Sequence, residues 1–345
     1  MTPQKVPLSS IAAAYLRVGA TAFGGPVMIG QIKKAARKRE WLTDKELSDG
    51  LSLVQLYPGP IGIDLVAYVG YKLRGVPGAI AACTFFVVPS FLLMLFLSWL
   101  YFEFGDISWV PTLFLGLEAL VVGLLVQFTA DLGKQNLRSL KQGAIAALSF
   151  AALLYRLNSV AIVLASLALG ALFLRPPEGK EHGGGEVEPA GLKRWLGIAA
   201  VGTIVVAATV LCWLSGTVAG AMGLSFFKIG SVAFGNGSTI LPLISVDVVE
   251  TNKWLTPSQF ADGIAMGQIT PGPFLITAAF IGYKLAGVFG AALATFAIFS
   301  PSFVMTMAFT EVFAKVKHLE PVKGALLGVM ASFVGLLALM VFQMG

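Results

Sequence analysis

Charged side chains are scarce in this chain of 345 residues, because Asp, Glu, Lys and Arg together make up only 12% of it. An average soluble domain has about 25%. Histidine and cysteine are also scarce, with two of each. Cys83 and Cys212 stand apart in apolar runs, and neither His182 nor His318 has partners for a catalytic triad. The sequence therefore predicts no metal site, no cofactor and no enzymatic centre.

Hydrophobic residues, in contrast, make up 57% of the chain. Apolar runs such as 79–102 and 195–214 reach the roughly 20 residues that a helix needs to cross a bilayer. We therefore expect an all-α polytopic membrane protein that contacts the lipid bilayer. The formal net charge of +6 lies mostly in short loops beside these runs. Such loop charge is typical of a membrane topology signal, so we expect no nucleic-acid binding.

An internal repeat divides the chain into two related halves. Matching motifs recur at a separation of 211 to 213 residues: Arg17–Gly24 with Lys228–Gly235, Trp41-Leu-Thr with Trp254-Leu-Thr, Pro58-Gly59-Pro60 with Pro271-Gly272-Pro273, Gly70-Tyr71 with Gly282-Tyr283, and Pro89-Ser90 with Pro301-Ser302. A stretch rich in proline, glycine and charge separates the two halves. We therefore expect an N-terminal repeat over 1–174, a linker over 175–194 and a C-terminal repeat over 195–345.

Equivalent loops of the two repeats carry opposite charge. After the first motif, the N-terminal repeat has six basic residues between Lys33 and Lys45, whereas the C-terminal repeat has Asp247, Glu250 and a single lysine. Lys and Arg are retained on the cytoplasmic side of a membrane. This reversal predicts that the two repeats have inverted topology.

Four apolar segments are broken at their centres by glycine and proline. The segments are 11–32, 47–71, 226–246 and 260–283, and the breaks are Gly24-Gly25-Pro26, Pro58-Gly59-Pro60, Gly235-Asn236-Gly237 and Pro271-Gly272-Pro273. Proline removes a backbone donor and glycine permits unusual dihedral angles. We expect four re-entrant helical hairpins among seven continuous crossings at about 78–102, 110–132, 143–157, 159–174, 195–214, 288–313 and 322–344.

Broken helices expose unpaired N–H groups and a favourable dipole at their N-termini, which bind anions. The alternative is that these residues only permit kinks and close helix packing. We expect a central anion site at the breaks, formed by Gly24, Gly25, Pro58, Gly59, Gly235, Asn236, Pro271 and Gly272. Uncharged polar groups nearby could complete its hydrogen bonds: Gln55, Gln268, Ser238, Thr239 and Thr270.

Four charged residues within apolar segments are further candidates. Arg17 and Lys228 occupy the same repeat position, and the sequence predicts that they contact the substrate or else snorkel to the membrane interface. Asp64 and Glu118 have apolar repeat counterparts. They could relay protons that are coupled to transport, or they could pair with a buried arginine or lysine.

Taken together, Phe23-Gly24-Gly25-Pro26, Pro58-Gly59-Pro60 and Gly70-Tyr71 resemble the chromate ion transporter family, in its long form with two repeats. The resemblance implies an inner-membrane protein that exports chromate and confers chromate resistance. The C-terminal repeat departs from the pattern, with Gly235-Asn236-Gly237 in place of Gly-Gly-Pro. A carrier of sulfate or another oxyanion and a passive anion channel are the alternatives, and a homodimer is a further possibility.

Overall fold

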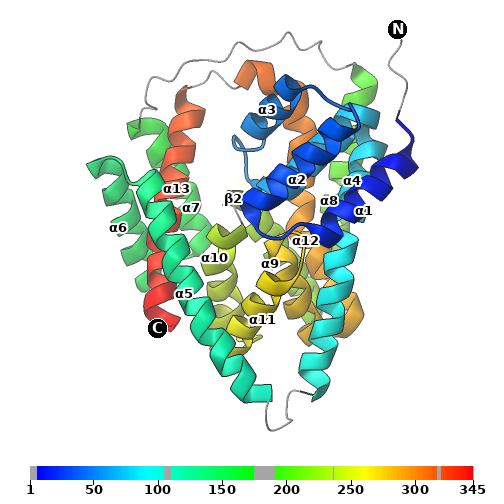
Figure 1. Ribbon diagram of the computed structural model, residues 1–345. Coiled ribbons are helices and arrows are strands. Elements are labelled where there is room, and N and C mark those ends of the chain that lie inside the picture. The colour runs from blue at the N-terminus through cyan, green and yellow to red at the C-terminus, as the bar shows by residue number, and fades with distance from the viewer. Residues whose placement is uncertain (1–5, 105–109, 175–190, 236, 317–319, 345) are drawn as a thin grey trace.

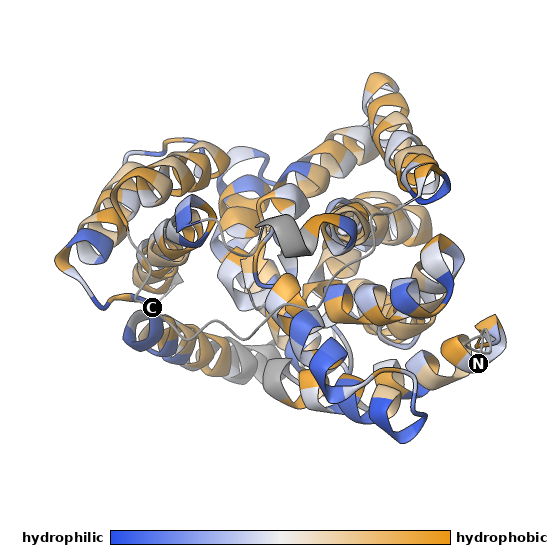
Figure 2. Cartoon of the chain, turned by 90° about the horizontal axis from the view of Figure 1, so that it is seen from above, coloured by the Kyte–Doolittle hydropathy of each residue, from blue (hydrophilic) through white to orange (hydrophobic). Residues whose placement is uncertain are grey.

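The computed structural model describes residues 6–104, 110–174, 191–235, 237–316 and 320–344. Almost all of these residues are helical (Figure 1). Four described helical segments are long and apolar enough to cross a membrane: Ile61–Phe104, Leu192–Leu214, Phe274–Val312 and Glu320–Gln343. Figure 2 shows hydrophobic residues along much of the helical surface. The prediction of an all-α polytopic membrane protein is confirmed.

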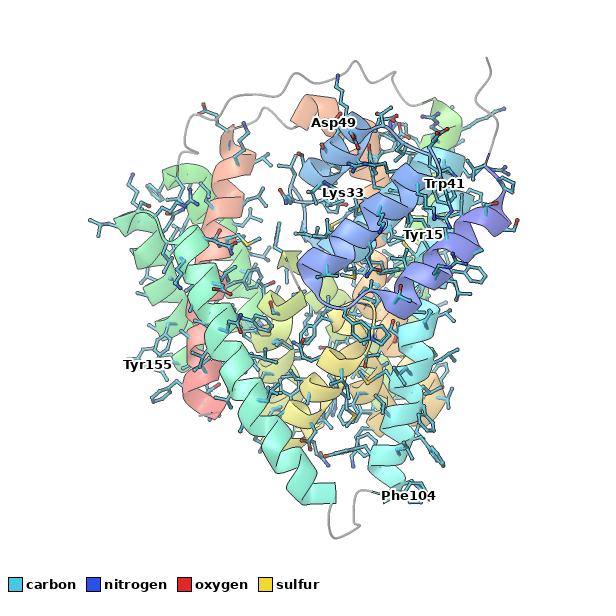
Figure 3. All side chains as sticks on the ribbon, in the orientation of Figure 1. Tyr15, Lys33, Trp41, Asp49, Phe104 and Tyr155 are labelled. Atoms are coloured by element: carbon cyan, nitrogen blue, oxygen red, sulfur yellow. The ribbon has the colours of Figure 1, made fainter. Side chains whose placement is uncertain are left out.

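The first broken hairpin consists of α1 (Leu8–Thr21) and α2 (Gly25–Lys38). Gly24 separates the two helices with a φ of 71°, in the left-handed region that glycine adopts without strain. Pro26 follows in the first turn of α2, where a missing N–H costs no helical hydrogen bond. The side chains of Tyr15 on α1 and Trp41 after α2 pack together behind this hairpin, with ring centroids 6.3 Å apart (Figure 3).

The second hairpin consists of α3 (Asp44–Leu53) and the first part of α4 (Ile61–Phe104), joined by the two-residue strand β1 (Gly59–Pro60). A capping box between Thr43 and Glu46 begins α3. Non-helical dihedral angles at Arg74 and Gly75 divide α4, and Gly75 has a φ of 63°. The hairpin therefore ends at this kink, and the remainder of α4 is a separate crossing, as the sequence predicts.

Four helices lie between the second and third hairpins: α5 (Val110–Asn136), α6 (Leu140–Leu154), α7 (Ser159–Phe173) and α8 (Leu192–Leu214). The side chains of Ser139 and Asn158 cap α6 and α7. In α7, Gly170 packs directly against the backbone of Gly324 and Gly328. Such close contacts between small residues are typical of helix pairs in membranes.

The C-terminal repeat contains the remaining elements: α9 (Val218–Ser231), β2 (Phe234–Gly235), η1 (Gly237–Ile240), α10 (Leu241–Ser245), η2 (Val246–Thr251), α11 (Pro257–Ile269), η3 (Phe274–Ile276), α12 (Thr277–Val316) and α13 (Glu320–Met344). Two features of its local structure match the N-terminal repeat. A capping box between Thr256 and Gln259 begins α11, and α12 is kinked at Ala286 and Gly287 with dihedral angles close to those of Arg74 and Gly75.

The third hairpin consists of α9 and the segment from η1 to η2, and it is less regular than the first. Where α2 is one helix, the equivalent segment is divided into a 3-10 turn, a short α-helix and the π-helical η2. Pro242 in this segment has no backbone N–H to donate. The Gly-Gly-Pro sequence that precedes and begins α2 is also absent from the third break.

In Figure 1, α1 to α3 lie in the upper half of the view, and α9 to α11 lie in the lower half. The hairpins of the two repeats therefore enter the molecule from opposite ends and approach one another at its centre. Lys33 lies in the upper half of Figure 3, and α13, which carries Lys323 in its first turn, begins at the upper end in Figure 1. This arrangement fits inverted repeats, whose orientation in the membrane stays a prediction.

Candidate functional site

The breaks of the second and third hairpins pair with each other. Gly59 lies opposite Phe234 and Pro60 lies opposite Gly235 in a parallel two-stranded contact between β1 and β2. The residues of this contact come from different repeats and are about half the chain apart in sequence. The contact therefore fixes one break of each repeat at the centre of the molecule.

The breaks of the first and fourth hairpins form a second contact. The backbone N–H of Gly272 donates a hydrogen bond of 2.7 Å to the carbonyl oxygen of Ala22. Gly272 has a φ of 100°, and a Cβ at this position would overlap the Ser90 side chain. Gly59 is packed in the equivalent way against Ser302. All four breaks are thus connected in two pairs, each of which joins one repeat to the other.

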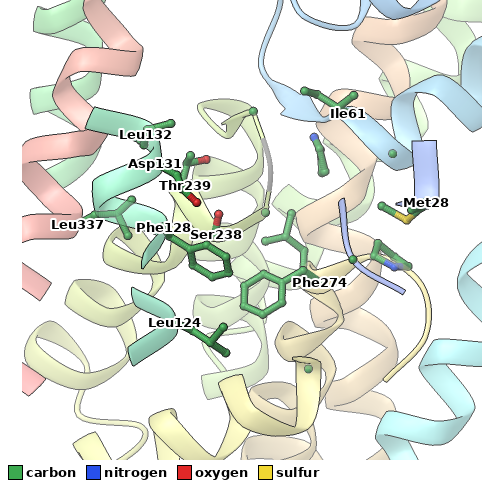
Figure 4. A pocket seen from close by; sticks show the side chains of 18 of the residues that line it. Met28, Ile61, Leu124, Phe128, Asp131, Leu132, Ser238, Thr239, Phe274 and Leu337 are labelled. Atoms are coloured by element: carbon green, nitrogen blue, oxygen red, sulfur yellow. The ribbon is translucent and has the colours of Figure 1, made fainter. Parts of the chain in front are cut away.

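A cavity of about 770 Å³ lies between these breaks, with α5 and α13 along its other wall (Figure 4). Every break contributes to its lining: Gly24 from the first, Pro60 from the second, Gly235 and Gly237 from the third, and Gly272 and Pro273 from the fourth. Non-helical backbone at membrane depth is tolerated where it is buried in protein or lines a water-filled cavity. The cavity therefore explains how this chain can hold four broken segments.

Each break places the start of a helical segment at the cavity. Gly24 precedes α2, Ile61 begins α4, Gly237 begins η1 and Phe274 begins η3, which leads into α12, and all four residues line the cavity. The first N–H groups of a helix have no partner within the helix, and its dipole favours negative charge. The convergence of these segments favours an anion over a cation.

Polar side chains provide further hydrogen-bonding groups. The cavity is lined by Gln55 and its repeat counterpart Gln268, and by Ser238, Thr239 and Thr270. These are the five uncharged polar residues near the breaks that the sequence analysis names. Thr239 and Thr270 direct their hydroxyl protons to the carbonyl oxygens of Phe234 and Met266. Their oxygens therefore act as acceptors in this conformation, so the two glutamine amides and Ser238 remain as potential donors.

One wall of the cavity was missed by sequence analysis. Gln127, Asp131 and Gln135 line it from α5 at a spacing of four residues, so they share one helix face. The spacing was visible in the sequence as a polar stripe on an apolar helix, but nothing in it showed which hairpins the stripe would meet. The rings of Phe128 and Phe274 lie near each other in the middle of Figure 4. Apolar groups thus lie among the polar ones.

The two basic candidates lie elsewhere. Arg17 on α1 and Lys228 on α9 are exposed, and the described lining contains neither. Lys228 lies beside Asp247, whose pKa is raised by burial and lowered to a smaller extent by the Lys228 charge. The Ser225 hydroxyl also donates to this carboxyl group. In this conformation, the breaks and the basic residues are therefore separate features, and their roles in binding stay predictions.

The remaining candidates lie beside the cavity or outside the described residues. Asp64 follows the lining residues Gly62 and Ile63 and is almost fully buried. Gly59 and Pro271 adjoin lining residues, Pro58 is two residues before the lining residue Pro60, and Gly25 is the first residue of α2. Asn236 and the side chain of Glu118 lie outside the residues that the structure describes. Among described side chains, no group of three His, Cys, Asp or Glu is close enough to hold a metal ion.

Comparison with known proteins identifies the family. A family model described as chromate transporter matches residues 9–171 and 220–345. A chromate transport protein of Cupriavidus metallidurans is 33% identical over 95% of this chain and 80% of its own length. An uncharacterized transporter of Methanocaldococcus jannaschii is 30% identical over 95% of this chain and 82% of its own. No solved structure matches the chain. The two matched segments include all four breaks, two in each segment, and the chain belongs to the chromate transporter family.

Proposed function

We propose that this protein carries chromate out of the cytoplasm across the inner membrane and thereby confers chromate resistance. The observation that carries the proposal is the convergence of four backbone breaks, two of which begin the helices α2 and α4, on one cavity lined by amide and hydroxyl groups. Chromate is a tetrahedral dianion with four acceptor oxygens. Backbone N–H groups can bind such an ion without a fixed positive charge.

The size of the cavity indicates how the ion is held in this conformation. Water occupies about 30 Å³ per molecule in the liquid, so a cavity of about 770 Å³ has room for an oxyanion with many water molecules. The ion can therefore keep much of its hydration, which lowers the cost of removing a dianion from water. Gly24, Gly25, Pro58, Gly59, Gly235, Asn236, Pro271 and Gly272 form the four breaks that we propose as the binding site.

Export of a dianion needs no further energy source than the membrane potential. One charge moved through 100 mV is worth about 2.3 kcal/mol, so a dianion leaving an inside-negative cell gains about 4.6 kcal/mol. This energy corresponds to a concentration ratio of more than about a thousandfold. Arg17 and Lys228 would assist by attracting oxyanions to the protein surface through long-range electrostatics.

Everted membrane vesicles with a set potential test this proposal. Their cytoplasmic face is outside, so chromate should accumulate inside when the lumen is positive, and sulfate and molybdate serve as competitors. Saturation and counterflow would identify a carrier, whereas flux without either would identify a passive channel. Vesicles that take up no more chromate than vesicles without the protein would contradict the proposal. Cells that express the protein should also grow at higher chromate concentrations.

A further inference from the structure

The carboxyl group of Asp64 fills the space behind the second break. Asp64 is in the first turn of α4 and is 1% exposed. A Cβ on Gly59 would overlap the Asp64 Oδ2 atom and the Ser302 side chain, so the absence of a side chain at Gly59 creates the space that the carboxyl group occupies. The break and the carboxyl group therefore form one packed unit.

Among the described residues, no positively charged group lies beside this carboxyl group. Both Asp64 oxygens are buried without a hydrogen bond, and neither of the two ion pairs within the described ranges includes Asp64. The titratable groups that face it are Tyr57 from the break and Cys83 from the same helix, and both are neutral or negative in any protonation state. A carboxylate buried without a counter-charge is strongly unfavourable.

The neighbouring hydroxyl groups distinguish the two forms of the carboxyl group. Ser302 and Thr306 lie beside Asp64 on α12, but their protons are directed to the carbonyl oxygens of Phe299 and Ser302. The Tyr57 hydroxyl donates in turn to Thr306. A carboxylate would gain a hydrogen bond here only if Ser302 or Thr306 turned its hydroxyl proton away from the carbonyl oxygen that it now bonds. A protonated carboxyl group, which has an O–H to donate, would find hydroxyl oxygens that can accept it.

Asp64 is also placed to influence an anion in the cavity. The three residues before it, Ile61, Gly62 and Ile63, line the cavity, and they form the N-terminus of α4. A negative charge in this turn would interact favourably with the helix dipole and so offset the attraction of α4 for a bound anion. It would also repel a dianion directly. The neutral form of Asp64 leaves the N-terminus of α4 available.

From these contacts, and on the basis of the proposed oxyanion site, we propose that Asp64 is a proton-binding residue whose protonated form allows the cavity to bind a dianion. The proton comes from water and forms an O–H bond with one carboxylate oxygen. It returns to water when the break moves away from Ser302 and Thr306 and opens the carboxyl group to solvent. The position has an apolar or hydroxyl counterpart, Ile276 or Thr277, in the other repeat. Binding of one oxyanion in the cavity is therefore linked to the uptake of one proton at Asp64.

Equilibrium binding of chromate to the full-length protein in lipid nanodiscs tests the proposal. If dianion binding takes up one proton, the affinity of the wild-type protein falls by up to about tenfold per pH unit as the pH rises. Asp64→Asn, which is permanently neutral and nearly isosteric, should keep the low-pH affinity at every pH. Chromate itself takes up a proton in weakly acidic solution, so the diagnostic quantity is the ratio of the two affinities at each pH.

Two further variants make the outcome specific. Asp49→Asn removes a carboxyl group from α3, outside the cavity lining, and should keep the wild-type pH profile. Asp131→Asn removes the carboxyl group on the cavity wall. If Asp131→Asn abolishes the pH dependence and Asp64→Asn does not, the proposal is wrong. It is also wrong if folded Asp64→Asn protein has the wild-type pH profile or binds no chromate at any pH. Absence of chromate binding by the wild-type protein would instead contradict the proposed function.

Infrared difference spectroscopy provides a test that does not depend on how well the Asp64 variant folds. Addition of chromate to the wild-type protein at alkaline pH should increase the C=O stretching band of a protonated carboxyl group. The same band should appear in Asp131→Asn protein. Chromate binding without this band in the wild-type protein would overturn the proposal.

Discussion

The backbone N–H of Gly272 donates a hydrogen bond to the carbonyl oxygen of Ala22, and this bond joins the fourth break to the first. Together with the pairing of Gly59 and Phe234, it makes the site a joint product of the two repeats. Each contact uses backbone atoms, whose positions depend on the glycines around them. The first two predictions therefore concern glycines.

Gly24→Leu should abolish chromate transport while the protein remains in the membrane. Gly24 lines the cavity, and a Cβ at this position has no neighbour within 4 Å, so a leucine side chain would extend into open space. Its positive φ costs about 1–2 kcal/mol, which a large membrane protein can tolerate. Transport per amount of membrane protein is the measurement. Normal transport by this variant would remove the first break from the oxyanion pathway.

Gly59→Ala should reduce the amount of folded protein. The added methyl group would overlap Asp64 and Ser302, and overpacking of this kind typically costs about 1–3 kcal/mol. The matched control is Gly123→Ala on α5, where a Cβ meets no atom within 4 Å and alanine favours the helix. Thermal unfolding in detergent compares the two variants. Equal thermal unfolding midpoints for Gly59→Ala and Gly123→Ala would show that the packing behind the second break is less tight than the structure indicates.

Arg17→Gln and Lys228→Gln should each raise the half-saturating chromate concentration by roughly twofold to tenfold at low ionic strength. Both side chains are exposed, so their attraction for an oxyanion acts through solvent and should weaken in high salt. Arg17→Lys keeps the charge and should resemble the wild type. If the residues only snorkel to the interface, the variants will instead lower membrane abundance and leave the half-saturating concentration unchanged.

Cysteines that replace Lys38 and Asn252 should react with a membrane-impermeant reagent from opposite sides. Both positions are exposed and lie after the returning segments of the first and third hairpins. The natural Cys83 and Cys212 are replaced in the background protein. Reaction of both introduced cysteines from the same side would show that the repeats are not inverted.

Much of the fold was predictable because its breaks are local. Glycine and proline restrict or release the backbone at their own positions, and the described breaks occur where the sequence places them. The kink at Gly75 falls between the expected end of the second hairpin at 71 and the expected start of the next crossing at 78. Helix ends in polar surroundings were less predictable. The first hairpin was expected to end at residue 32, but α2 continues to Lys38 because its exposed basic face needs no apolar environment.

The site was only partly predictable, because it depends on which helices meet. The glycines and glutamines at the breaks have a local signature, whereas Gln127 and Asp131 become part of the cavity only because α5 packs against hairpins far away in sequence. The exposure of Arg17 has the same origin. A helix with a basic residue on one face gives no information about the direction in which tertiary packing turns that face.

The pairing of β1 with β2 also has a consequence for biosynthesis. Gly59 is made long before Phe234, its partner, and the hydrogen bond to Ala22 requires Gly272. A ribosome that has completed only the N-terminal repeat has therefore inserted two hairpins without the partners of their breaks. The cavity is completed only when the fourth hairpin and then α13 have entered the membrane, so a nascent chain that lacks them contains no complete oxyanion site.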